Sequence, residues 1–285
     1  MKNNYKGVDD IEAFSYIVNR LRKFCLEKDF LEVHTQDRLS ILATCEDPET
    51  VATYKYMGKT WPLPQTGQMW LEYELMTRPE LPGVFCVSTS YRNEPNPVPG
   101  RHKLIFPMFE FELQGGIDEL KKFEIELLEY LGFGTKQDFV FKTYDQLKKH
   151  YKTDELTHEH ENKMKKDFGN VVFCQDFPVY TSPFWNMKSK GKNHAEKIDV
   201  IIAGNETIGS AVRSTDKKQM RKSFHTISNG GYAKKLYDLF GKPRVEKELD
   251  EFLDFNFFPR CGGGIGLTRL INAMKENRHE QSKQQ

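Results

Sequence analysis

The chain has 285 residues, which is enough for one large mixed domain or two small domains, each with a sizeable core. Its 42 Lys and Arg residues nearly balance its 41 Asp and Glu residues, and the formal net charge of +1 excludes a general electrostatic nucleic-acid binder. With 38% hydrophobic and 13% aromatic residues, the composition excludes a disordered chain and favours a compact soluble protein.

The N-terminal segment 1–14 has no apolar core of signal-peptide length. No segment of the sequence approaches the roughly 18 consecutive apolar residues of a membrane span. The five cysteines are scattered and include no C-x-x-C pair that would suggest zinc binding or redox chemistry. We therefore expect a cytoplasmic protein with reduced thiols and no contact with a membrane.

The first half of the chain predicts a helix followed by a long hairpin. Residues 10–28 place apolar side chains at helical spacing and have an aspartate at the start as a candidate N-cap. Short apolar runs in 30–42 are typical of extended segments. Segments 83–91 and 104–114 are rich in strand-forming residues and are separated by a Pro/Gly-rich stretch, so they predict a long antiparallel hairpin.

The second half predicts further helices and strands around one sheet. Residues 117–131 form an amphipathic pattern, and 196–203 with 206–213 predict a strand pair. Near the C-terminus, three consecutive glycines lead into a helical pattern. We expect an α+β fold in which helices flank a mostly antiparallel sheet, with one domain at 1–275 and a polar, frayed tail at 276–285.

The predicted hairpin carries residue types that suit a nucleoside triphosphate. Arg92 and Glu94 follow the first strand, Arg101 and His102 lie in the connecting loop, and Phe106 lies on the return strand. An arginine side chain can bind two phosphate oxygens at once, and an aromatic ring can stack on a base. A carboxylate can accept a hydrogen bond from an exocyclic amine. Alone, the same pattern also fits a surface hairpin with solvated charges.

A second group of polar residues lies on the predicted strand pair. Asp199 and Glu206 can share one face and bind Mg²⁺ together with phosphate oxygens, and Arg213 can bind a substrate carboxylate or amide; a structural ion pair is the alternative. The glycine-rich segment matches neither a Rossmann nor a P-loop pattern. Its glycines allow a ligand to approach the backbone, with Arg269 reaching a terminal phosphate, or they allow close packing.

Taken together, these segments resemble the catalytic domain of class II aminoacyl-tRNA synthetases. Residues 7–36 resemble motif 1 of that class, 91–112 resemble motif 2, and 262–270 resemble motif 3, in the same order along nearly the whole chain. The resemblance implies the class II antiparallel sheet flanked by helices. It also implies a homodimer, because motif 1 builds the dimer interface in this class.

Within the class, the chain is most similar to the aspartyl and asparaginyl subgroup. Residues 63–72 resemble its substrate segment, and Asp199, Glu206 and Arg213 match its D-x(6)-E-x(6)-R pattern. The similarity implies the following contacts: Arg92 with the α-phosphate, Phe106 with adenine, Glu94 with the adenine amine, Arg101 or His102 with the outer phosphates, Arg269 with the γ-phosphate, and Asp199 with Glu206 binding Mg²⁺.

The same similarity implies where the amino acid binds. Glu46 matches the position that holds the substrate ammonium, with Gln68 beside it, and Arg213 reads the side-chain carboxylate or amide. Aspartyl enzymes place a lysine three residues after the glutamine, whereas Leu71 stands here and Glu72 follows it, as in the asparaginyl type. Glu72 can accept from an amide but repels a carboxylate, so the pocket looks asparaginyl-like.

The subgroup's N-terminal anticodon-binding barrel is not apparent, since motif 1 begins near residue 10. Bare cores of this lineage resemble ammonia-dependent asparagine synthetases. We therefore expect ATP-dependent adenylation of aspartate, with Arg92 and Arg269 as catalytic residues, followed by amidation with ammonia to give asparagine, AMP and pyrophosphate. One alternative is a synthetase paralogue that activates an amino acid for tRNA or another acceptor. The other is a catalytically silent regulatory paralogue.

One further motif invites a metal-site interpretation. His158-Glu-His-Glu161 lacks the histidine at position 162 that H-E-x-x-H requires, because Asn162 stands there. It lies in the charged, insertion-like stretch 145–168. We interpret the motif as part of a solvated charged helix.

Overall fold

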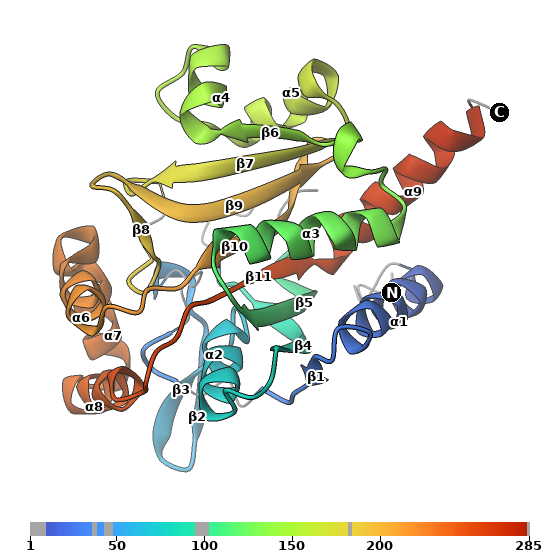
Figure 1. Cartoon of the computed structure of the whole chain (residues 1–285). Coiled ribbons are helices and arrows are strands. Elements are labelled where there is room, and N and C mark those ends of the chain that lie inside the picture. Colours follow the sequence, from blue (N-terminus) through green and yellow to red (C-terminus); the bar gives the residue numbers. More distant parts are fainter. Residues whose placement is uncertain (1–9, 36–38, 43–47, 95–102, 182–183, 284–285) are drawn as a thin grey trace, which may run out of the picture.

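The computed structural model of the chain describes residues 10–35, 39–42, 48–94, 103–181 and 184–283. Among these residues, nine strands form one main sheet in which most neighbouring strands run antiparallel (Figure 1). Helices pack against the sheet, as the α+β prediction requires.

The elements have the following bounds. The helices are α1 (Ile11–Leu26), α2 (Gln68–Thr77), α3 (Ile117–Leu131), α4 (Tyr144–Tyr151), α5 (His158–Phe168), α6 (Lys217–Thr226), α7 (Gly231–Phe240), α8 (Lys242–Leu253) and α9 (Leu267–Lys283). The strands of the main sheet are β1 (Leu31–Glu32), β4 (Gly83–Tyr91), β5 (Ile105–Gln114), β6 (Val140–Thr143), β7 (Val171–Pro178), β8 (Ser189–Lys190), β9 (His194–Ile202), β10 (Asn205–Val212) and β11 (Arg260–Gly266). A separate hairpin consists of β2 (Thr53–Tyr56) and β3 (Lys59–Pro62).

The order of strands across the main sheet is β1-β4-β5-β11-β10-β9-β7-β6, and β8 pairs with β9. Only the β1–β4 and β6–β7 pairs are parallel among the described strands. The predicted hairpin is confirmed as β4 and β5, which pair from Gly83 with Leu113 to Tyr91 with Ile105. The glycine-rich strand β11 lies between β5 and β10, so segments far apart in sequence become neighbours at the centre of the sheet.

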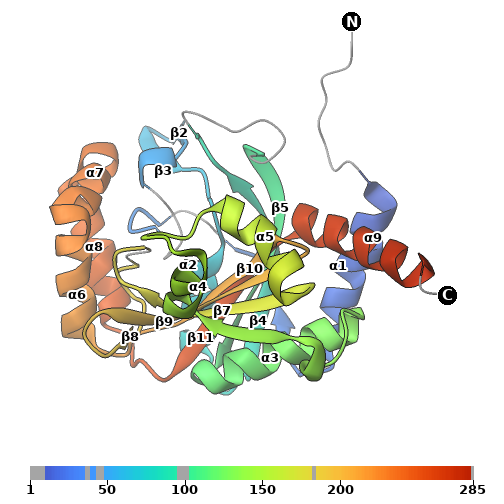
Figure 2. The same ribbon diagram turned by 90° about the horizontal axis from the view of Figure 1, so that it is seen from above.

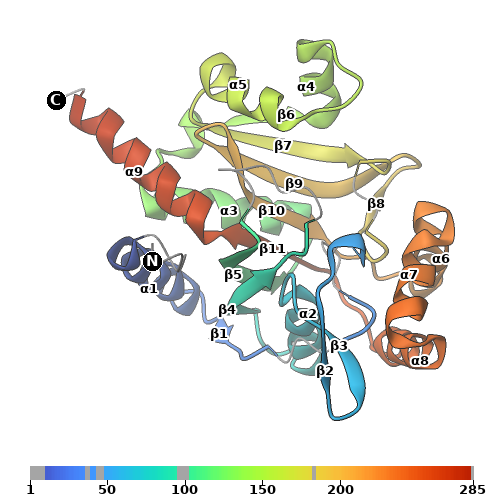
Figure 3. The same ribbon diagram turned by 180° about the vertical axis from the view of Figure 1, so that it is seen from behind.

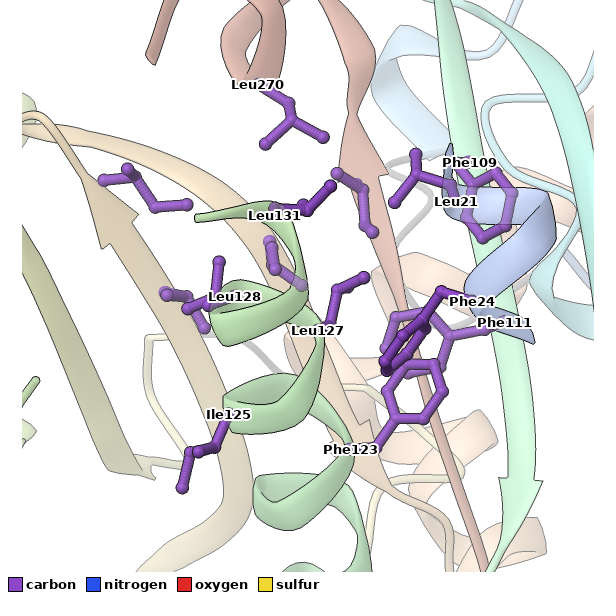
Figure 4. Packing of buried hydrophobic residues seen from close by; sticks show 14 of the residues in the cluster. Leu21, Phe24, Phe109, Phe111, Phe123, Ile125, Leu127, Leu128, Leu131 and Leu270 are labelled. Atoms are coloured by element: carbon purple, nitrogen blue, oxygen red, sulfur yellow. The ribbon is translucent and has the colours of Figure 1, made fainter. Parts of the chain in front are cut away.

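Helices α1, α3 and α9 lie on one face of the sheet and enclose the largest hydrophobic core of the described residues. Figure 4 shows α1 and α3 with their apolar side chains against the strands; Phe24 of α1 and Phe123 of α3 pack with ring centres 5.3 Å apart. Phe109 and Phe111 of β5 point into the same core. Because side chains alternate along a strand, Glu110 points to the opposite face. The burial of the two phenylalanines in the core therefore determines which face of β5 carries Glu110.

One carboxyl group is buried on the hydrophobic side. Glu124 of α3 is fully buried, and its carboxyl lies 2.6 Å from the Ser210 hydroxyl. Burial raises the pKa of Glu124 to about 8, so the group is protonated at neutral pH. The Ser210 oxygen also lies 3.1 Å from the Ile198 carbonyl. A protonated Glu124 can donate to Ser210, which leaves the serine hydrogen for Ile198.

Helices α6, α7 and α8 form a second cluster at one end of the sheet, away from α1 and α9 (Figure 2). They pack around Trp185, Phe224 and Phe252, whose rings meet edge to face. Figure 3 shows the side where α2 and the β2–β3 hairpin lie. Helices α6, α7 and α8 were not predicted from the sequence, although Val245, Leu249 and Phe252 of α8 lie at helical spacing.

The last helix differs from the prediction of a frayed tail. Helix α9 continues past residue 275 to Lys283. Glu276 forms an ion pair with Lys165 of α5, and Asn277 donates to the carbonyl of Gly132 at 2.9 Å. These contacts stabilise a polar segment that has no apolar face of its own. Among the described residues, no helix is long and apolar enough to cross a membrane.

Candidate active site

The end of the β4–β5 hairpin forms one wall of the candidate site. The backbone N–H of Arg92 donates to the carbonyl of Leu104 at 2.8 Å, which extends the pairing beyond β4. The Arg92 guanidinium lies 5.7 Å from the centre of the Phe106 ring. Its buried Nε has no hydrogen-bond partner among the described residues. Since an unsatisfied buried donor costs free energy, this arrangement favours an anionic ligand.

A cavity of about 830 Å³ lies beside this hairpin. Arg92, Glu94 and Phe106 of the hairpin line it, together with Glu206 of β10 and Arg269 of α9. Four of these residues are predicted to bind ATP and the fifth to bind Mg²⁺. The volume suits a nucleotide-sized ligand. The tertiary structure thus collects the predicted nucleotide contacts from three separate parts of the chain in one cavity.

Arg269 lies in the first turn of α9, next to Glu206. Its Nη1 donates to the Glu206 carbonyl at 2.6 Å and lies 3.7 Å from the Glu206 carboxylate oxygen Oε2. Both side chains remain more than a third exposed, at 39% and 38%. The arginine is therefore held at the cavity but stays accessible to a ligand.

Asp199 and Glu206 lie on the same side of the β9–β10 pair. A Cβ on Gly209, which pairs with Asp199, would lie 3.0 Å from Glu206 Oε1 and 3.6 Å from Asp199 Oδ1. The glycine therefore keeps open the space between the two carboxylates. Burial raises the pKa of Asp199 to about 7; the charge of Lys197 opposes this change, and Glu206 adds to it.

These two carboxylates fit a magnesium ion. Asp199 Oδ1 is buried and has no hydrogen-bond partner within the described part of the chain. Mg²⁺ prefers carboxylate oxygens and commonly completes its shell with phosphate oxygens and water. No group of three or more His, Cys, Asp or Glu side chains among the described residues could hold a metal ion. Asp199 and Glu206 would therefore hold Mg²⁺ only together with a ligand that supplies further oxygens.

The predicted amino-acid residues form a buried polar network on the same face of the sheet. Arg213 contacts both oxygens of Glu112, at 3.2 Å from Nε and 3.0 Å from Nη2, and its Nε lies 3.7 Å from Glu72. Gln68 donates to Glu112 at 2.9 Å and to the Phe111 carbonyl at 3.0 Å. Burial raises the pKa of Glu112, and the charge of Arg213 opposes this effect.

Glu72 is the second carboxylate of this network, and a second arginine holds it. Arg260 Nε donates to Glu72 Oε2 at 2.9 Å, and Asn186 Nδ2 donates to Oε1 at 2.9 Å. Glu72, Arg260 and Asn186 are fully buried. The structure therefore brings together Gln68, Glu72 and Arg213 as predicted, but it shows Glu72 bound to protein groups on both oxygens.

Sequence reasoning missed Glu110, Glu112 and Arg260. Glu110 is fully buried, accepts from the backbone N–H of Gly67 at 2.8 Å, and accepts from the hydroxyls of Thr66 and Ser88. The alternation in the predicted strand 104–114 already placed the two glutamates on one face, opposite the phenylalanines. No local signal identified Arg260, because its partner lies 188 residues earlier.

Three predicted site residues, Glu46, Arg101 and His102, lie outside the described residues. The charged segment around His158 is helical and largely exposed, as predicted. It forms α5, and His158 and Asn162 line the same cavity as Arg92. The side chain of Glu161 accepts from the backbone N–H of Glu206 at 3.4 Å. This helix is therefore part of the cavity wall and is not wholly solvated.

The chain is similar in sequence to known tRNA synthetases. Residues 3–279 match the family described as tRNA synthetases class II (D, K and N). Two curated relatives are an aspartate–tRNA(Asp) ligase of Pyrobaculum aerophilum, 27% identical over 42% of the chain, and a lysine–tRNA ligase of Methylobacillus flagellatus, 22% identical over 56% of it. The matches span only 25% and 27% of these relatives.

Solved structures share the fold at low sequence identity. Asparaginyl-tRNA synthetase of Pyrococcus horikoshii, in complex with asparaginyl-adenylate, matches with a TM-score of 0.75 and 19% identity, covering 93% of this chain and 64% of that one. A putative aspartyl-tRNA synthetase of Leishmania major matches with a TM-score of 0.75 and 17% identity, covering 92% of this chain and 61% of that one. These matches confirm the predicted α+β architecture.

Proposed function

The chain belongs to the class II tRNA synthetase family of the D, K and N type, and from this premise we propose that it activates an amino-acid carboxylate by transfer of AMP from ATP. The cavity that collects Arg92, Phe106, Glu206 and Arg269 is the observation that carries the proposal. The buried Nε of Arg92 has no hydrogen-bond partner among the described residues, and the side chain of Arg269 is accessible. The two arginines therefore supply two separate positive contacts for a triphosphate.

The residues would act by binding, orienting and neutralising charge. Phe106 would stack on the adenine and Glu94 would accept from its amine, while Arg92 would hold the α-phosphate and Arg269 the γ-phosphate. When bound at Asp199 and Glu206, Mg²⁺ would neutralise phosphate charge. Arg92 would stabilise the charge that develops as the amino-acid carboxylate attacks the α-phosphorus in line with the departing pyrophosphate. The first step needs no protein nucleophile or base.

We propose aspartate as the substrate and ammonia as the acceptor. In the second step, ammonia would attack the carbonyl carbon of the adenylate. The new C–N bond would replace the C–O bond to AMP, AMP would leave, and a proton would pass to solvent, which yields asparagine. Because asparagine forms only when the side-chain carboxylate of aspartate is adenylated, aspartate would bind with its α-carboxylate at Arg213. This orientation is the reverse of the one that the family resemblance implies.

One observation favours a second candidate, activation of asparagine or a similar neutral amino acid for tRNA or another acceptor. Arg213 is bound by both oxygens of Glu112 and lies close to Glu72. A substrate carboxylate at Arg213 would compete with Glu112 for the guanidinium and would lie close to Glu72. An amide could instead accept from the arginine and donate to a carboxylate.

Product analysis separates the two candidates. The protein is incubated with ATP, Mg²⁺ and L-aspartate, with and without ammonium and without tRNA, and AMP and amino acids are measured. Asparagine that forms only with ammonium and in step with AMP supports the synthetase proposal. Pyrophosphate exchange that depends on L-asparagine, without amidation of aspartate, supports the second candidate. Arg269→Ala is the control: exchange that takes place at the proposed ATP site should fall in this variant.

A silent regulatory paralogue would not need to keep this arrangement. Arg92, Arg269, Asp199 and Glu206 are all present and meet around one cavity and its edge. Measurement of ATP binding with and without Mg²⁺ tests this alternative directly. If the protein shows no Mg²⁺-dependent binding, a silent module is the better account.

A further inference from the structure

A lysine occupies the position next to the acidic pair where a metal ion would bind. Lys197 lies two residues before Asp199 on β9, so both side chains project from the same face of the sheet. The ammonium of Lys197 lies 2.9 Å from Asp199 Oδ2, and each side chain is only 11% exposed. This contact is an internal ion pair at the edge of the cavity.

Packing keeps the ammonium in this place. Lys197 Nζ lies 4.1 Å from the centre of the Phe177 ring on the neighbouring strand β7, a distance typical of a cation over an aromatic face. Burial alone would lower the pKa of Lys197, but the charges of Asp199 and Glu206 raise it above its usual value. The side chain is therefore held between an aromatic ring and a carboxylate.

Each predicted magnesium ligand thus contacts a cation of the protein. Lys197 pairs with Asp199, and Arg269 pairs with Glu206. A free divalent ion that approaches the carboxylates meets two positive charges that already offset them. A triphosphate adds several negative charges and its own oxygens, and it gives the ion ligands that the protein does not supply.

We propose that Lys197 is a built-in counter-cation that prevents the acidic pair from binding a free divalent ion, so that the metal enters with ATP. This inference rests on the proposed function, because it takes Asp199 and Glu206 as metal ligands for bound ATP. Lys197 acts through Asp199 and is a positioning residue. Lys197 determines the order of binding, because the metal ion does not bind before the nucleotide.

Titration with Mn²⁺, followed by the electron paramagnetic resonance signal of the free ion, tests the proposal without any assay of activity. Lys197→Gln removes the charge but keeps an N–H donor for Asp199, and Lys197→Met removes both. Without nucleotide, we expect both variants to bind Mn²⁺ at least about tenfold more tightly than the unmodified protein, since one unit charge near a divalent ion has this effect even at a water-like dielectric constant.

Two control variants match this change. Lys197→Arg keeps the positive charge and should bind free Mn²⁺ as weakly as the unmodified protein. Lys190→Met removes a lysine that pairs with Asp176 at 2.8 Å on the same sheet but lies away from the cavity, and it should leave Mn²⁺ binding unchanged. A purely structural role of Lys197 would lower thermal stability in the Gln variant without changing its Mn²⁺ affinity.

The outcomes separate the inference from the proposed function. If Lys197→Gln binds free Mn²⁺ no more tightly than the unmodified protein, or if the unmodified protein binds it tightly without ATP, the inference is wrong. Because ATP alone also binds Mn²⁺, the loss of free ion is compared with that in the same ATP solution without protein. If the unmodified protein takes up no Mn²⁺ beyond that control, the proposed ATP site itself is wrong. Uptake beyond the control that requires ATP in the unmodified protein, but not in Lys197→Gln, supports both.

Discussion

Replacing Gly262 by alanine tests how the glycine-rich strand supports the site. A Cβ at this position would lie 1.9 Å from Glu112 Oε2, 2.8 Å from Gln68 Nε2 and 2.4 Å from the carbonyl oxygen of Phe111. The two side chains can rotate away, but the carbonyl oxygen belongs to the β5 backbone, which pairs with β11. Gly262→Ala therefore has to shift a central strand and move Glu112 away from Arg213.

The cost can be worked from these contacts. Overpacking in a well-packed interior costs about 1 to 3 kcal/mol. Breaking the buried Glu112–Arg213 pair from one side costs about 3 to 5 kcal/mol. Because part of that pair can re-form, we expect a total loss of about 4 kcal/mol in the free energy of unfolding. For 285 residues, the unfolding entropy is about 0.6 kcal/mol per kelvin, so the melting temperature should fall by about 7 °C.

Thermal unfolding and amino-acid-dependent pyrophosphate exchange measure the two consequences. Gly231→Ala is the matched control, because Gly231 has helical backbone angles and its added Cβ would meet only the Ser228 side chain at 3.7 Å. The control should keep its melting temperature. If Gly262→Ala is as stable as the control but no longer binds ATP, the glycine serves ligand approach, and the packing explanation is refuted.

Four other changes have distinct expected results. Arg269→Ala should raise the KM for ATP at least about tenfold, whereas Arg213→Lys, which loses the paired contact with Glu112, should raise the KM for the amino acid and leave ATP binding intact. Pyrophosphate exchange measures both KM values: Arg269→Ala should not change the KM for the amino acid, and Arg213→Lys should not change the KM for ATP. Phe106→Leu should weaken ATP binding by about 1 kcal/mol, measured by calorimetry; unchanged affinity would exclude stacking. The stability contribution of protonated Glu124 is complete below its unfolded pKa of 4.5 and is lost as pH rises through about 8. Because pH 5 already lies above 4.5, denaturation at pH 5 and at pH 9 should show the unfolding free energy of Glu124→Gln rising by about 4 kcal/mol relative to that of the unmodified protein. Parallel curves would contradict this.

Regular patterns in the sequence predicted the parts of the site that lie on one continuous element. The β4–β5 hairpin, α1 and α3 follow from apolar spacing and turn residues within each segment. The patterns of 196–203 and 206–213 predicted a strand pair that carries Asp199 and Glu206, and the structure confirms this pairing as β9 with β10. Local periodicity was sufficient because these residues are near neighbours along the chain.

Sequence patterns could not predict contacts between segments that are distant along the chain. The pairing of Arg260 with Glu72 joins residues 188 positions apart, and the pairing of Arg213 with Glu112 joins residues 101 positions apart. Alternation can assign each side chain to a face, but it does not say which side chains on separate elements meet. The prediction that Glu72 is available to a substrate amide changes once Arg260 and Asn186 occupy its oxygens.

The sequence by itself determined the first helix, the hairpin, the strand pair and the residue types that suit a nucleotide, because these depend on local periodicity and turn residues. Its resemblance to the three class II motifs implied the architecture. Only the tertiary structure decided which charges neutralise one another: Arg213 with Glu112, Arg260 with Glu72, and Lys197 with Asp199. The physical reason is that the charge of a site depends on distances of a few ångströms between side chains. Apart from the Lys197–Asp199 pair within β9, those distances arise only when separate elements pack together.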